Sequence, residues 1–359
     1  MTAQAGNVIK VLVVDDSAFM RRVISDILDG DPEIKVISTA TNGVDAIEKA
    51  KTLQPDLITL DIEMPLMNGL SCLQELLKTR FLPVIMLSSL TKAGTEYTIK
   101  ALEYGAVDFI AKPENIFEMT GEGKKKEIID KVKTAGRLKK TKVNTLPNDL
   151  FEENGFANKE STNSKIEYIV AIGTSTGGPK ALQSVIPLIP GNIPAAFLVV
   201  QHMPPGFTKS LAERLNSVSK VIVKEAEDGE IVKAGHVYIA PGDYHMAFEK
   251  NNPDGLKIKT TRDAPVSGHR PAVNYMMDSL SQTGIKNVIG VIMTGMGGDG
   301  SDGVVMLKRN NSGYIIAQDE ETCVVYGMPK MAVQTGVVDA VVPLNKITSE
   351  IIRIVGVRI

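Results

Sequence analysis

The chain has 359 residues and a formal net charge of −2 at pH 7, and 43% of its residues are hydrophobic. This length predicts two domains, each large enough to bury its own hydrophobic core. The near-neutral charge excludes a global field that would attract nucleic acid or an anionic membrane. No apolar run reaches membrane-spanning length and no apolar signal segment opens the sequence, so we expect a cytoplasmic protein without membrane insertion. The two cysteines, Cys72 and Cys323, lie in different halves, which favours reduced thiols over a disulfide framework.

The first 120 residues alternate apolar strand-like runs with amphipathic helical patterns. This alternation predicts a parallel sheet that is covered by helices on both faces. Strands are expected at 10–16, 35–41, 55–61, 83–89 and 106–113, with helices such as 18–28 and 44–53 between them. A further helix is expected at about 124–140, where apolar residues recur at helical spacing among lysines, so we interpret the lysines as a solvated surface face.

Residues 141–165 are polar and lack sustained periodicity, which predicts a flexible linker. The alternation of strands and helices resumes after it. Further strands are expected at 166–173, 195–202, 236–242, 287–295 and 313–319. The sequence therefore predicts an α/β domain at 1–140, the linker, and a second α/β domain at 166–359, each with a parallel sheet.

Chemically active side chains stand at the expected carboxyl ends of the first-domain strands: Asp15 and Asp16, Asp61, Ser88 and Lys112. In parallel α/β sheets, ligands bind outside these ends. Any one of these acids alone would be explained as a helix cap or a turn residue. Three converging carboxylates, however, repel one another unless a cation lies among them, and oxygen ligands select a hard ion such as Mg²⁺. A carboxylate beside Mg²⁺ and a lysine can attack a phosphoryl group, which predicts an aspartyl-phosphate.

The stretches "VLVVDDS", "DLITLDIEMPLMNG", "IMLSS" and "DFIAKP" resemble the response-regulator receiver domain over residues 8 to about 120. The resemblance implies a flavodoxin-like fold in which Asp61 accepts phosphate from a histidine kinase. It also implies that Asp15 and Asp16 bind Mg²⁺, Asp16 more directly, and that the backbone carbonyl of Glu63 adds a ligand.

The same resemblance assigns the residues that respond to phosphorylation. Ser88 matches the switch hydroxyl and Phe109 the aromatic switch position, and Lys112, which is expected to balance charge or hold an anionic group near Asp61, is grouped with these switch residues. Phenylalanine stands there in place of the more familiar tyrosine, so no ring hydroxyl takes part. A receiver domain is a switch, which places the output in the second domain.

The second domain opens with "GTSTG", which fits G-x-S-x-G, a serine on a sharp turn between a strand and a helix. Such a turn exposes the hydroxyl of Ser175, and the backbone amides that follow can stabilise an oxyanion. A phosphate-binding P-loop would need lysine and then serine or threonine after Gly178, where Pro179 stands instead. From this motif alone, a purely structural glycine turn remains open.

A nucleophilic serine needs a base, and the chain has four histidines. His202 ends its strand and is therefore expected at the same sheet edge as Ser175. His236 begins its strand and is expected at the opposite edge, whereas His245 and His269 are expected in loops that could line a pocket. An orienting carboxylate is expected at a third strand end, where Asp299 is preferred and Asp302 is the alternative.

A competing pattern occurs at residues 295–300, "GMGGDG", which is a G-x-G-x-x-G directly after an expected strand. Asp319 ends the next strand about 20 residues further on, as in dinucleotide-binding sites. These residues leave open a receiver-regulated dinucleotide-binding oxidoreductase, which would leave Ser175 and His202 without a role.

The stretches "AIGTSTGGPKAL", "QHMPPGFT", "AGHVYIAPGDYHM" and "TGMGGDGSDG" resemble the catalytic domain of chemotaxis protein-glutamate methylesterases over roughly 166–359. The resemblance implies a Rossmann-like doubly wound sheet, with Ser175 as nucleophile, His202 as base and Asp299 as orienting carboxylate. Thr176 and Met296 are the candidate backbone donors to the oxyanion. Thr174 replaces an alanine that is common in this motif, and we expect the change to be tolerated.

The combined resemblance implies a phosphorylation-activated hydrolase that acts on γ-methyl glutamyl esters of chemoreceptor cytoplasmic helices and deamidates glutamines there. It implies chemoreceptors as substrates, the chemotaxis histidine kinase as phosphodonor and no cofactor for the esterase step. The fusion of a switch to a catalytic domain motivates the hypothesis that the receiver shields the active site until Asp61 is phosphorylated.

Overall fold

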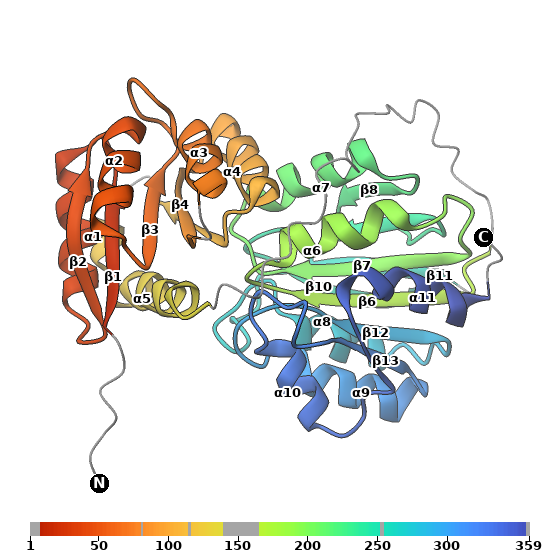
Figure 1. Cartoon of the computed structure of the whole chain (residues 1–359). Coiled ribbons are helices and arrows are strands. Elements are labelled where there is room, and N and C mark those ends of the chain that lie inside the picture. The colour runs from red at the N-terminus through yellow and green to blue at the C-terminus, as the bar shows by residue number, and fades with distance from the viewer. Residues whose placement is uncertain (1–7, 80–81, 114–115, 139–164, 252–254, 357–359) are drawn as a thin grey trace, which may run out of the picture. The chain divides into compact units, whose positions relative to one another are not determined.

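The computed structural model describes residues 8–79, 82–113, 116–138, 165–251 and 255–356. The chain forms two compact units, Met1–Val143 and Asn144–Ile359 (Figure 1). The linker predicted at 141–165 lies outside the described residues, except for Lys165. Among the described residues, no helix is long and apolar enough to cross a membrane. Cys72 and Cys323 are both buried and form no disulfide with each other, in line with the expected reduced thiols.

The first unit is a five-stranded sheet in the order β2-β1-β3-β4-β5, and every pairing in it is parallel. All five predicted strands are present. They are β1 (Ile9–Val14), β2 (Ile34–Ala40), β3 (Leu57–Asp61), β4 (Val84–Ser89) and β5 (Asp108–Lys112). The helices are α1 (Ala18–Asp29), α2 (Gly43–Leu53), α3 (Gly69–Thr79), α4 (Lys92–Tyr104) and α5 (Glu122–Gly136), with a short 3₁₀ helix η1 (Ile116–Thr120).

Local chemistry fixes several helix starts and strand faces in this unit. The side chains of Ser17, Asn42 and Thr91 accept hydrogen bonds from backbone amides of the first turns of α1, α2 and α4. The central strands β1, β3 and β4 are almost entirely buried, because α1 and α5 pack together on one side of the sheet and α2, α3 and α4 on the other (Figure 1). Because both faces of these strands are buried, their sequences are continuous apolar runs rather than alternations of apolar and polar residues.

The prediction for the last helix of this unit was wrong at its end. α5 stops at Gly136, whereas the lysine-rich pattern predicted a helix to residue 140. Glycine is unfavourable inside a helix, which explains an end at this position. The solvated-face interpretation also fails for Lys131, whose Nζ lies 3.2 Å from Asp108 Oδ1 and donates to the carbonyl oxygen of Phe109 at 2.5 Å.

The second unit contains a seven-stranded, wholly parallel sheet in the order β14-β13-β12-β6-β7-β9-β8. Its strands are β6 (Tyr168–Thr174), β7 (Ala195–Gln201), β8 (Ile222–Glu225), β9 (His236–Ile239), β12 (Val288–Ile292), β13 (Tyr314–Gln318) and β14 (Ala340–Val342). The helices are α6 (Gly178–Val185), α7 (Phe207–Val218), α8 (Val273–Ser281), α9 (Ser301–Asn311), α10 (Met328–Gln334) and α11 (Ile347–Val355), with 3₁₀ turns η4 (Ile186–Leu188) and η5 (Leu344–Lys346).

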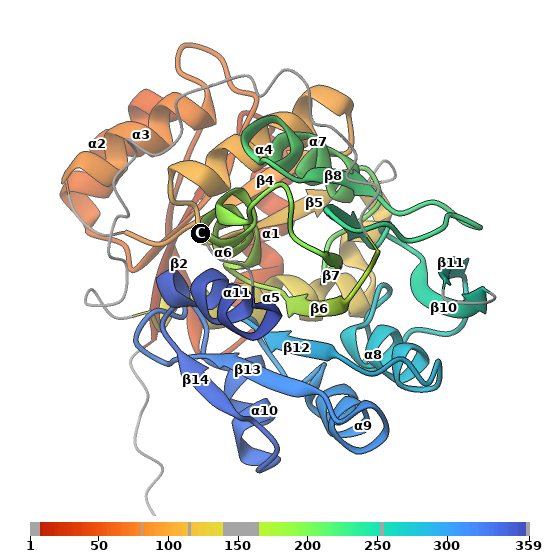
Figure 2. The ribbon, with the colours of Figure 1, turned by 90° about the vertical axis from the view of Figure 1, so that its right-hand side faces the viewer.

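The sheet of the second unit is doubly wound, as predicted. Helices α6, α7 and α11 cover one face, and α8, α9 and α10 cover the other (Figures 1 and 2). The strand order reverses between β6 and β12, because β6 is followed by β7 on one side while β12 lies on its other side. The carboxyl ends of strands at such a switch point form the usual ligand crevice of an open α/β sheet.

Three features of the second unit were missed in the sequence. β8 and β14 are short, and an antiparallel hairpin joins β10 (His245–Asn251) to β11 (Gly255–Thr261). In β11 the buried Leu256 and Ile258 alternate with more exposed lysines, so a period of two was available in the sequence there, whereas β10 begins with a buried run from His245 to Phe248. The expectation that His245 lies in a loop was therefore wrong, because it is the first residue of β10.

A close approach in the first unit yields a stability prediction. A Cβ atom at Gly69 would lie 2.0 Å from the carbonyl oxygen of Asp61, so alanine must displace the end of β3. Gly69→Ala should lower the free energy of unfolding of this unit by about 2–3 kcal/mol. Gly123→Ala is the matched control, because nothing lies within 4 Å of that Cβ position.

Calorimetry of the full-length variants checks this prediction. The transition of the first unit should fall in temperature for Gly69→Ala and stay level or rise slightly for Gly123→Ala, since alanine favours helix. Equal transition temperatures for the two variants would contradict the proposed clash.

Candidate functional site

In the first unit, the predicted acidic residues meet at the carboxyl ends of β1, β3 and β5. Lys112 Nζ lies 2.8 Å from Asp15 Oδ2 and 2.8 Å from Asp61 Oδ1. Both carboxylates are buried, and Asp16 beside them is exposed. The predicted lysine thus bridges two of the three predicted acids.

Burial controls the protonation of this cluster. Burial raises the pKa of Asp61 to about 6, and the nearby negative charge of Asp15 adds to the rise, while Lys112 opposes it. Burial also disfavours the charged form of Lys112, but Asp61 and Asp15 outweigh this effect and raise the lysine's pKa. The pocket therefore carries more negative charge than one lysine balances.

The residues predicted to bind Mg²⁺ fit a hard cation. One carboxylate oxygen from each of Asp15, Asp16 and Asp61 lies within 4.8 Å of the others. Glu63 lines the same hollow as Asp16, directly after β3. Oxygen donors in this arrangement match the preference of Mg²⁺.

Two of the predicted switch residues, Ser88 and Phe109, are buried, and each contacts groups outside the acidic cluster. Ser88 Oγ donates to the carbonyl oxygen of Gly94 at 3.1 Å and accepts from Thr98 Oγ1 at 2.6 Å. The ring of Phe109 is buried, and Lys131 Nζ lies 5.1 Å from its centroid. In this state the Ser88 hydroxyl is bonded to α4 rather than to the acidic cluster.

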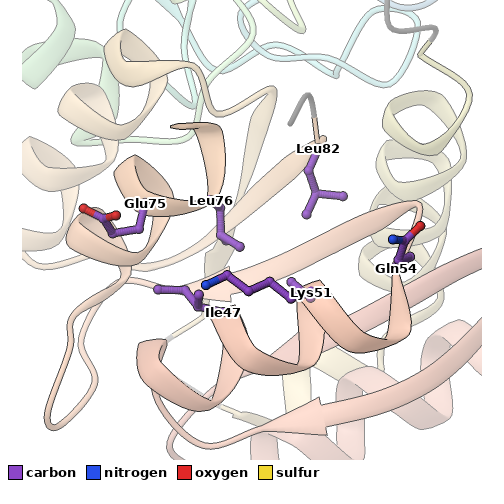
Figure 3. A pocket seen from close by; sticks show the side chains of 7 residues that line it. Ile47, Lys51, Gln54, Glu75, Leu76 and Leu82 are labelled. Atoms are coloured by element: carbon purple, nitrogen blue, oxygen red, sulfur yellow. The ribbon is translucent and has the colours of Figure 1, made fainter. Parts of the chain in front are cut away.

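A second hollow of the first unit lies between α2 and α3, away from the predicted site residues. Figure 3 shows that its lining combines apolar side chains with one lysine, one glutamate and one glutamine. Its labelled lining residues are Ile47, Lys51, Gln54, Glu75, Leu76 and Leu82. None of them is a residue that the sequence singled out, and the hollow shows no convergence of acids or nucleophiles.

In the second unit, Ser175 stands on the predicted turn between β6 and α6. Its backbone N–H donates to the carbonyl oxygen of Thr294 at 3.0 Å, and its carbonyl oxygen accepts from the N–H of Gly178 at 2.7 Å. Gly177 has φ +76°, a left-handed conformation that favours glycine, and Pro179 occupies the first turn of α6. The glycines thus allow the sharp turn that leaves the serine side chain half-buried at the sheet edge.

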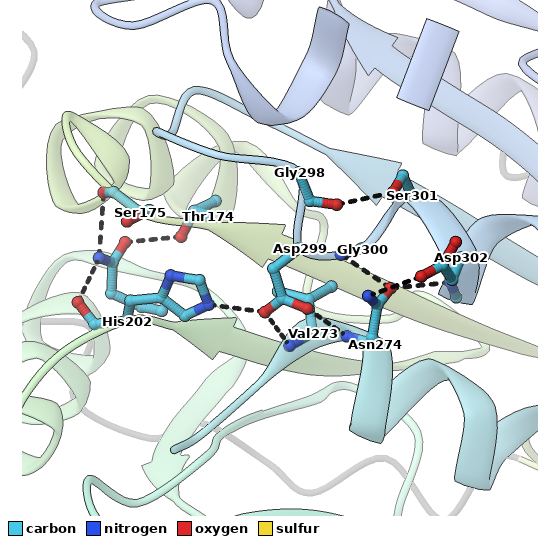
Figure 4. A network of polar contacts seen from close by, with 12 residues as sticks. Thr174, Ser175, His202, Val273, Asn274, Gly298, Asp299, Gly300, Ser301 and Asp302 are labelled. Atoms are coloured by element: carbon cyan, nitrogen blue, oxygen red, sulfur yellow. Dashed lines mark hydrogen bonds and ion pairs between the residues drawn. The ribbon is translucent and has the colours of Figure 1, made fainter. Parts of the chain in front are cut away.

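His202 and Asp299 lie in contact, as predicted. His202 Nε2 is 2.8 Å from Asp299 Oδ2, and both side chains are almost fully buried (Figure 4). The acceptor-only carboxylate requires the ring proton on Nε2, which leaves Nδ1 as the basic nitrogen. Nδ1 is buried and has no hydrogen-bond partner among the described residues.

Asp299 also caps a helix. Its Oδ2 accepts from the backbone N–H of Val273 at 2.6 Å, and its Oδ1 accepts from that of Asn274 at 2.9 Å, both in the first turn of α8. Burial alone would raise the pKa of Asp299, but the hydrogen bonds from His202 and from these amides hold it below its usual range. Asp299 is therefore an ionised carboxylate, stabilised by the positive end of a helix.

Of the remaining candidates, one histidine lies against the pair of His202 and Asp299, and another histidine and the alternative acid do not contact it. The ring of His269 stacks on that of His202 with 3.8 Å between centroids, so this loop histidine lies at the site. His236 bonds to the carbonyl oxygen of Ala234 at the far end of the sheet. Asp302 accepts a long contact of 3.5 Å from the Asn274 amide, so the preference for Asp299 is supported by the contacts.

Two backbone donors at the start of the helix that follows the "GMGGDG" loop are already used. The N–H groups of Gly300 and Gly303, at the start of α9, both donate to Asn274 Oδ1 at 2.9 Å. Asp319 accepts hydrogen bonds from the backbone and hydroxyl of Thr322. The "GMGGDG" loop thus positions Asp299 and has no unpaired helix-end amides at these positions for a pyrophosphate.

The candidate oxyanion loops lie close together. Thr294 Oγ1 donates to the carbonyl oxygen of Thr176 at 2.9 Å, and this bond ties the β12 loop to the serine turn. A Cβ at Gly295 would lie 2.9 Å from Ser175 Cβ, so the residue before Met296 touches the serine. The contacts of Thr294 were not predicted, because a threonine after a strand carries no motif of its own.

The fold and these contacts define a class of protein. One unit gathers carboxylates and a lysine at the ends of a five-stranded parallel sheet, as receivers do. The other brings a serine, a histidine and a buried carboxylate to the switch point of a doubly wound sheet, as serine hydrolases do.

Comparison with known proteins places the chain within this class. A family model described as CheB methylesterase matches residues 170–351, and one described as response regulator receiver domain matches residues 11–122. A protein named protein-glutamate methylesterase/protein-glutamine glutaminase from Pyrococcus abyssi is 47% identical over 98% of this chain and 94% of its own length. One named protein-glutamate methylesterase/protein-glutamine glutaminase 1, from Syntrophomonas wolfei, is 48% identical over 96% of this chain and 98% of its own.

A solved structure is similar to the second unit. The crystal structure of the Thermotoga maritima CheB methylesterase catalytic domain is 48% identical, with a TM-score of 0.50, over 52% of this chain and 97% of that chain. The chain belongs to the CheB methylesterase family of receiver-linked hydrolases. The comparisons lend the oxidoreductase alternative no support.

The raised pKa of Asp61 predicts a pH-dependent stability. Because the folded state holds this proton more tightly than the unfolded state, the free energy of unfolding should fall as the pH rises from about 4 to about 6. Asp61→Asn removes this cost, so in EDTA at pH 7.5 the variant should be about 2–3 kcal/mol more stable than wild type, and about equal near pH 4.

Urea unfolding of the full chain at several pH values measures this difference. Asp26→Asn is the control, because Asp26 forms only an exposed ion pair with Arg22. Two results would contradict the account: an Asp61→Asn variant that is less stable than wild type at pH 7.5, or one whose free energy of unfolding differs from wild type by the same amount at pH 7.5 and near pH 4.

Proposed function

We propose that this chain hydrolyses γ-methyl esters of glutamate residues on the cytoplasmic helices of chemoreceptors, and deamidates glutamines there. Membership of the CheB methylesterase family and the names of its relatives support the substrate class. Ser175 is the nucleophile, His202 the base and Asp299 the carboxylate that orients the base.

A single observation carries this proposal. The buried pair of His202 and Asp299 leaves Nδ1 of the imidazole without a partner, at the sheet edge where the neighbouring strand delivers Ser175. A buried nitrogen without a hydrogen-bond partner lowers stability, and a catalytic role explains why a fold retains such a group. In this proposal the group that gives up a proton to Nδ1 is the hydroxyl of Ser175, which directly follows the paired residue Thr174 as His202 follows Gln201.

The acylation step uses these groups in sequence. His202 Nδ1 takes the hydroxyl proton of Ser175 while Oγ attacks the ester carbonyl, and Asp299 stabilises the imidazolium that forms. The tetrahedral intermediate collapses, the bond to the methoxy group breaks, and methanol leaves with the proton from His202. The product of this step is a glutamyl ester of Ser175.

Deacylation repeats the same proton transfers with water. His202 removes a proton from the attacking water, the Ser175 ester bond breaks, and the serine recovers its proton while a glutamate carboxylate is released. A glutamine substrate follows the same route, with ammonia in place of methanol.

Thr176 and Met296 supply the backbone donors to the oxyanion in this proposal. Support comes from the tie between their loops, through the hydroxyl of Thr294 and the contact of Gly295 with Ser175. Amides held in this way need no rearrangement as charge develops on the ester oxygen.

The receiver unit regulates the esterase in this proposal. Asp61 accepts a phosphoryl group from the chemotaxis histidine kinase, and Asp15, Asp16 and the backbone carbonyl of Glu63 hold Mg²⁺ beside it. A bound Mg²⁺ supplies positive charge that stabilises the phosphoryl oxygens during transfer. Lys112 binds the phosphoryl group, and the rearrangement of Ser88 and Phe109 relieves inhibition of the esterase.

Methanol release from methylated receptor membranes tests the proposed function. Full-length wild type should release methanol, faster with a small phosphodonor and Mg²⁺, whereas Ser175→Ala should release none above background. Asp61→Asn should keep the basal rate and lose the response to the phosphodonor. Absence of release from wild type under every condition would refute the esterase, and an equal rate with and without phosphodonor would refute the regulation.

The two acids near the site give a matched pair of variants. Asp299→Asn removes the charge that holds the imidazole, so its rate of methanol release should fall by about 10³- to 10⁴-fold. Asp302→Asn should stay within about threefold of wild type, because Asp302 makes only one long contact to Asn274. Equal rates for the two variants would contradict the assignment of Asp299.

A further inference from the structure

The side chain of Gln201 lies at the last rung between β6 and β7. Thr174 and Gln201 are the final paired residues of these parallel strands, and Ser175 and His202 directly follow them. The backbone ladder ends with the N–H of His202, which donates to the carbonyl oxygen of Thr174 at 3.2 Å. The nucleophile and the base of the proposed reaction thus stand where the regular hydrogen bonding between β6 and β7 ends.

The carboxamide of Gln201 continues the connection past this point. Its Nε2 donates to the carbonyl oxygen of Ser175 at 3.0 Å and to that of His202 at 3.2 Å. Gln201 is 2% exposed, so water does not compete for these bonds. One side chain therefore ties the backbone of the nucleophile to the backbone of the base.

The orientation of this amide is set by its surroundings. Carbonyl oxygens only accept hydrogen bonds, so the amide nitrogen must face Ser175 and His202 and the amide oxygen must face away. On that side, Thr174 Oγ1 donates to Gln201 Oε1 at 2.6 Å, and Thr174 is completely buried (Figure 4). A flipped amide would place its oxygen against two carbonyl oxygens and lose both bonds to the main chain.

The start of α6 is built around the same group. A Cβ at Gly178 would lie 1.9 Å from Gln201 Oε1 and 2.8 Å from Thr174 Cβ. The helix that follows the nucleophile can therefore begin here only with a glycine. Both bonds of the amide nitrogen go to main-chain carbonyls of Ser175 and His202, so they affect the alignment of these two residues rather than contacts to a substrate.

We propose that Gln201 is a positioning residue that holds Ser175 and His202 in register, and that the hydroxyl of Thr174 fixes its amide. This inference rests on the proposed esterase chemistry. It also gives Thr174 a function in this chain beyond that of a tolerated replacement for alanine.

Steady-state kinetics of methanol release with phosphodonor and Mg²⁺, in full-length protein, test the inference. Gln201→Met keeps the length of the side chain without its hydrogen bonds, and should lower kcat by about 100-fold with KM nearly unchanged, since small misalignments are costly. Thr174→Val should lower kcat by about tenfold, because it leaves Gln201 Oε1 buried without a donor. Thr174→Ser keeps the hydroxyl and should restore kcat to near the wild-type value.

The matched control removes a buried threonine hydroxyl elsewhere in the same unit. Thr348 Oγ1 donates to the carbonyl oxygen of Val185 at 2.9 Å, so Thr348→Val should lower the thermal midpoint without lowering kcat. If Gln201→Met does not fold, the comparison of Thr174→Val with Thr174→Ser decides the question at matched thermal midpoints.

The outcomes distinguish the inference from the proposed function. No methanol release from wild type would contradict the proposed function, and this inference with it. An active wild type whose Gln201→Met variant keeps kcat within threefold would overturn the inference alone. So would a Thr174→Ser variant as slow as Thr174→Val, or a Thr348→Val variant with the same loss of kcat.

Discussion

The buried hydrogen bond between His202 and Asp299 is the interaction on which the chemistry of the second unit depends. A carboxylate in this position would be costly without partners, since burial disfavours its charge. The two amides of the first turn of α8 and the imidazole proton supply those partners. As a result the carboxylate stays ionised, the ring is held by Nε2, and Nδ1 is the nitrogen available to a nucleophile.

Both units hold buried carboxylates, and the two units compensate the negative charge of these groups differently. Each gathers polar groups at the carboxyl ends of parallel strands, where the chain leaves the sheet and side chains can converge. In the first unit a lysine, Lys112, bridges Asp15 and Asp61 and leaves a cluster with excess negative charge. In the second unit, a helix end and a histidine satisfy a single carboxylate. The first arrangement suits a cation and an anionic group, and the second suits proton transfer.

Much of this architecture was predictable, because apolar runs of strand length identify which residues stand at strand ends. That reasoning alone placed Asp61, Lys112, His202 and Asp299 at the edges where the structure has them. It failed where no regular pattern marks the structure. α5 ends early at a glycine, Lys131 turns inward to Asp108, and β8 and β14 are too short to detect.

Polar residues that act through backbone contacts were the other omission. Gln201, Thr294 and Asn274 bind main-chain groups of the site, yet nothing in their sequence context distinguishes them from ordinary surface residues. Their contacts arise only when separate strands and loops meet. The "GMGGDG" loop shows the converse, since a sequence pattern that suggests a dinucleotide site instead positions Asp299, and its helix amides bond to Asn274.

The central claim is that the hydroxyl of Ser175 is a nucleophile activated by His202. The most direct test is to treat the full-length protein with a fluorophosphonate, which reacts only with activated serines, and to locate the adduct by peptide mass spectrometry. A single adduct on Ser175, formed much more slowly in His202→Ala, is the result expected. An unlabelled Ser175, or labelling at an equal rate without the histidine, would contradict the account.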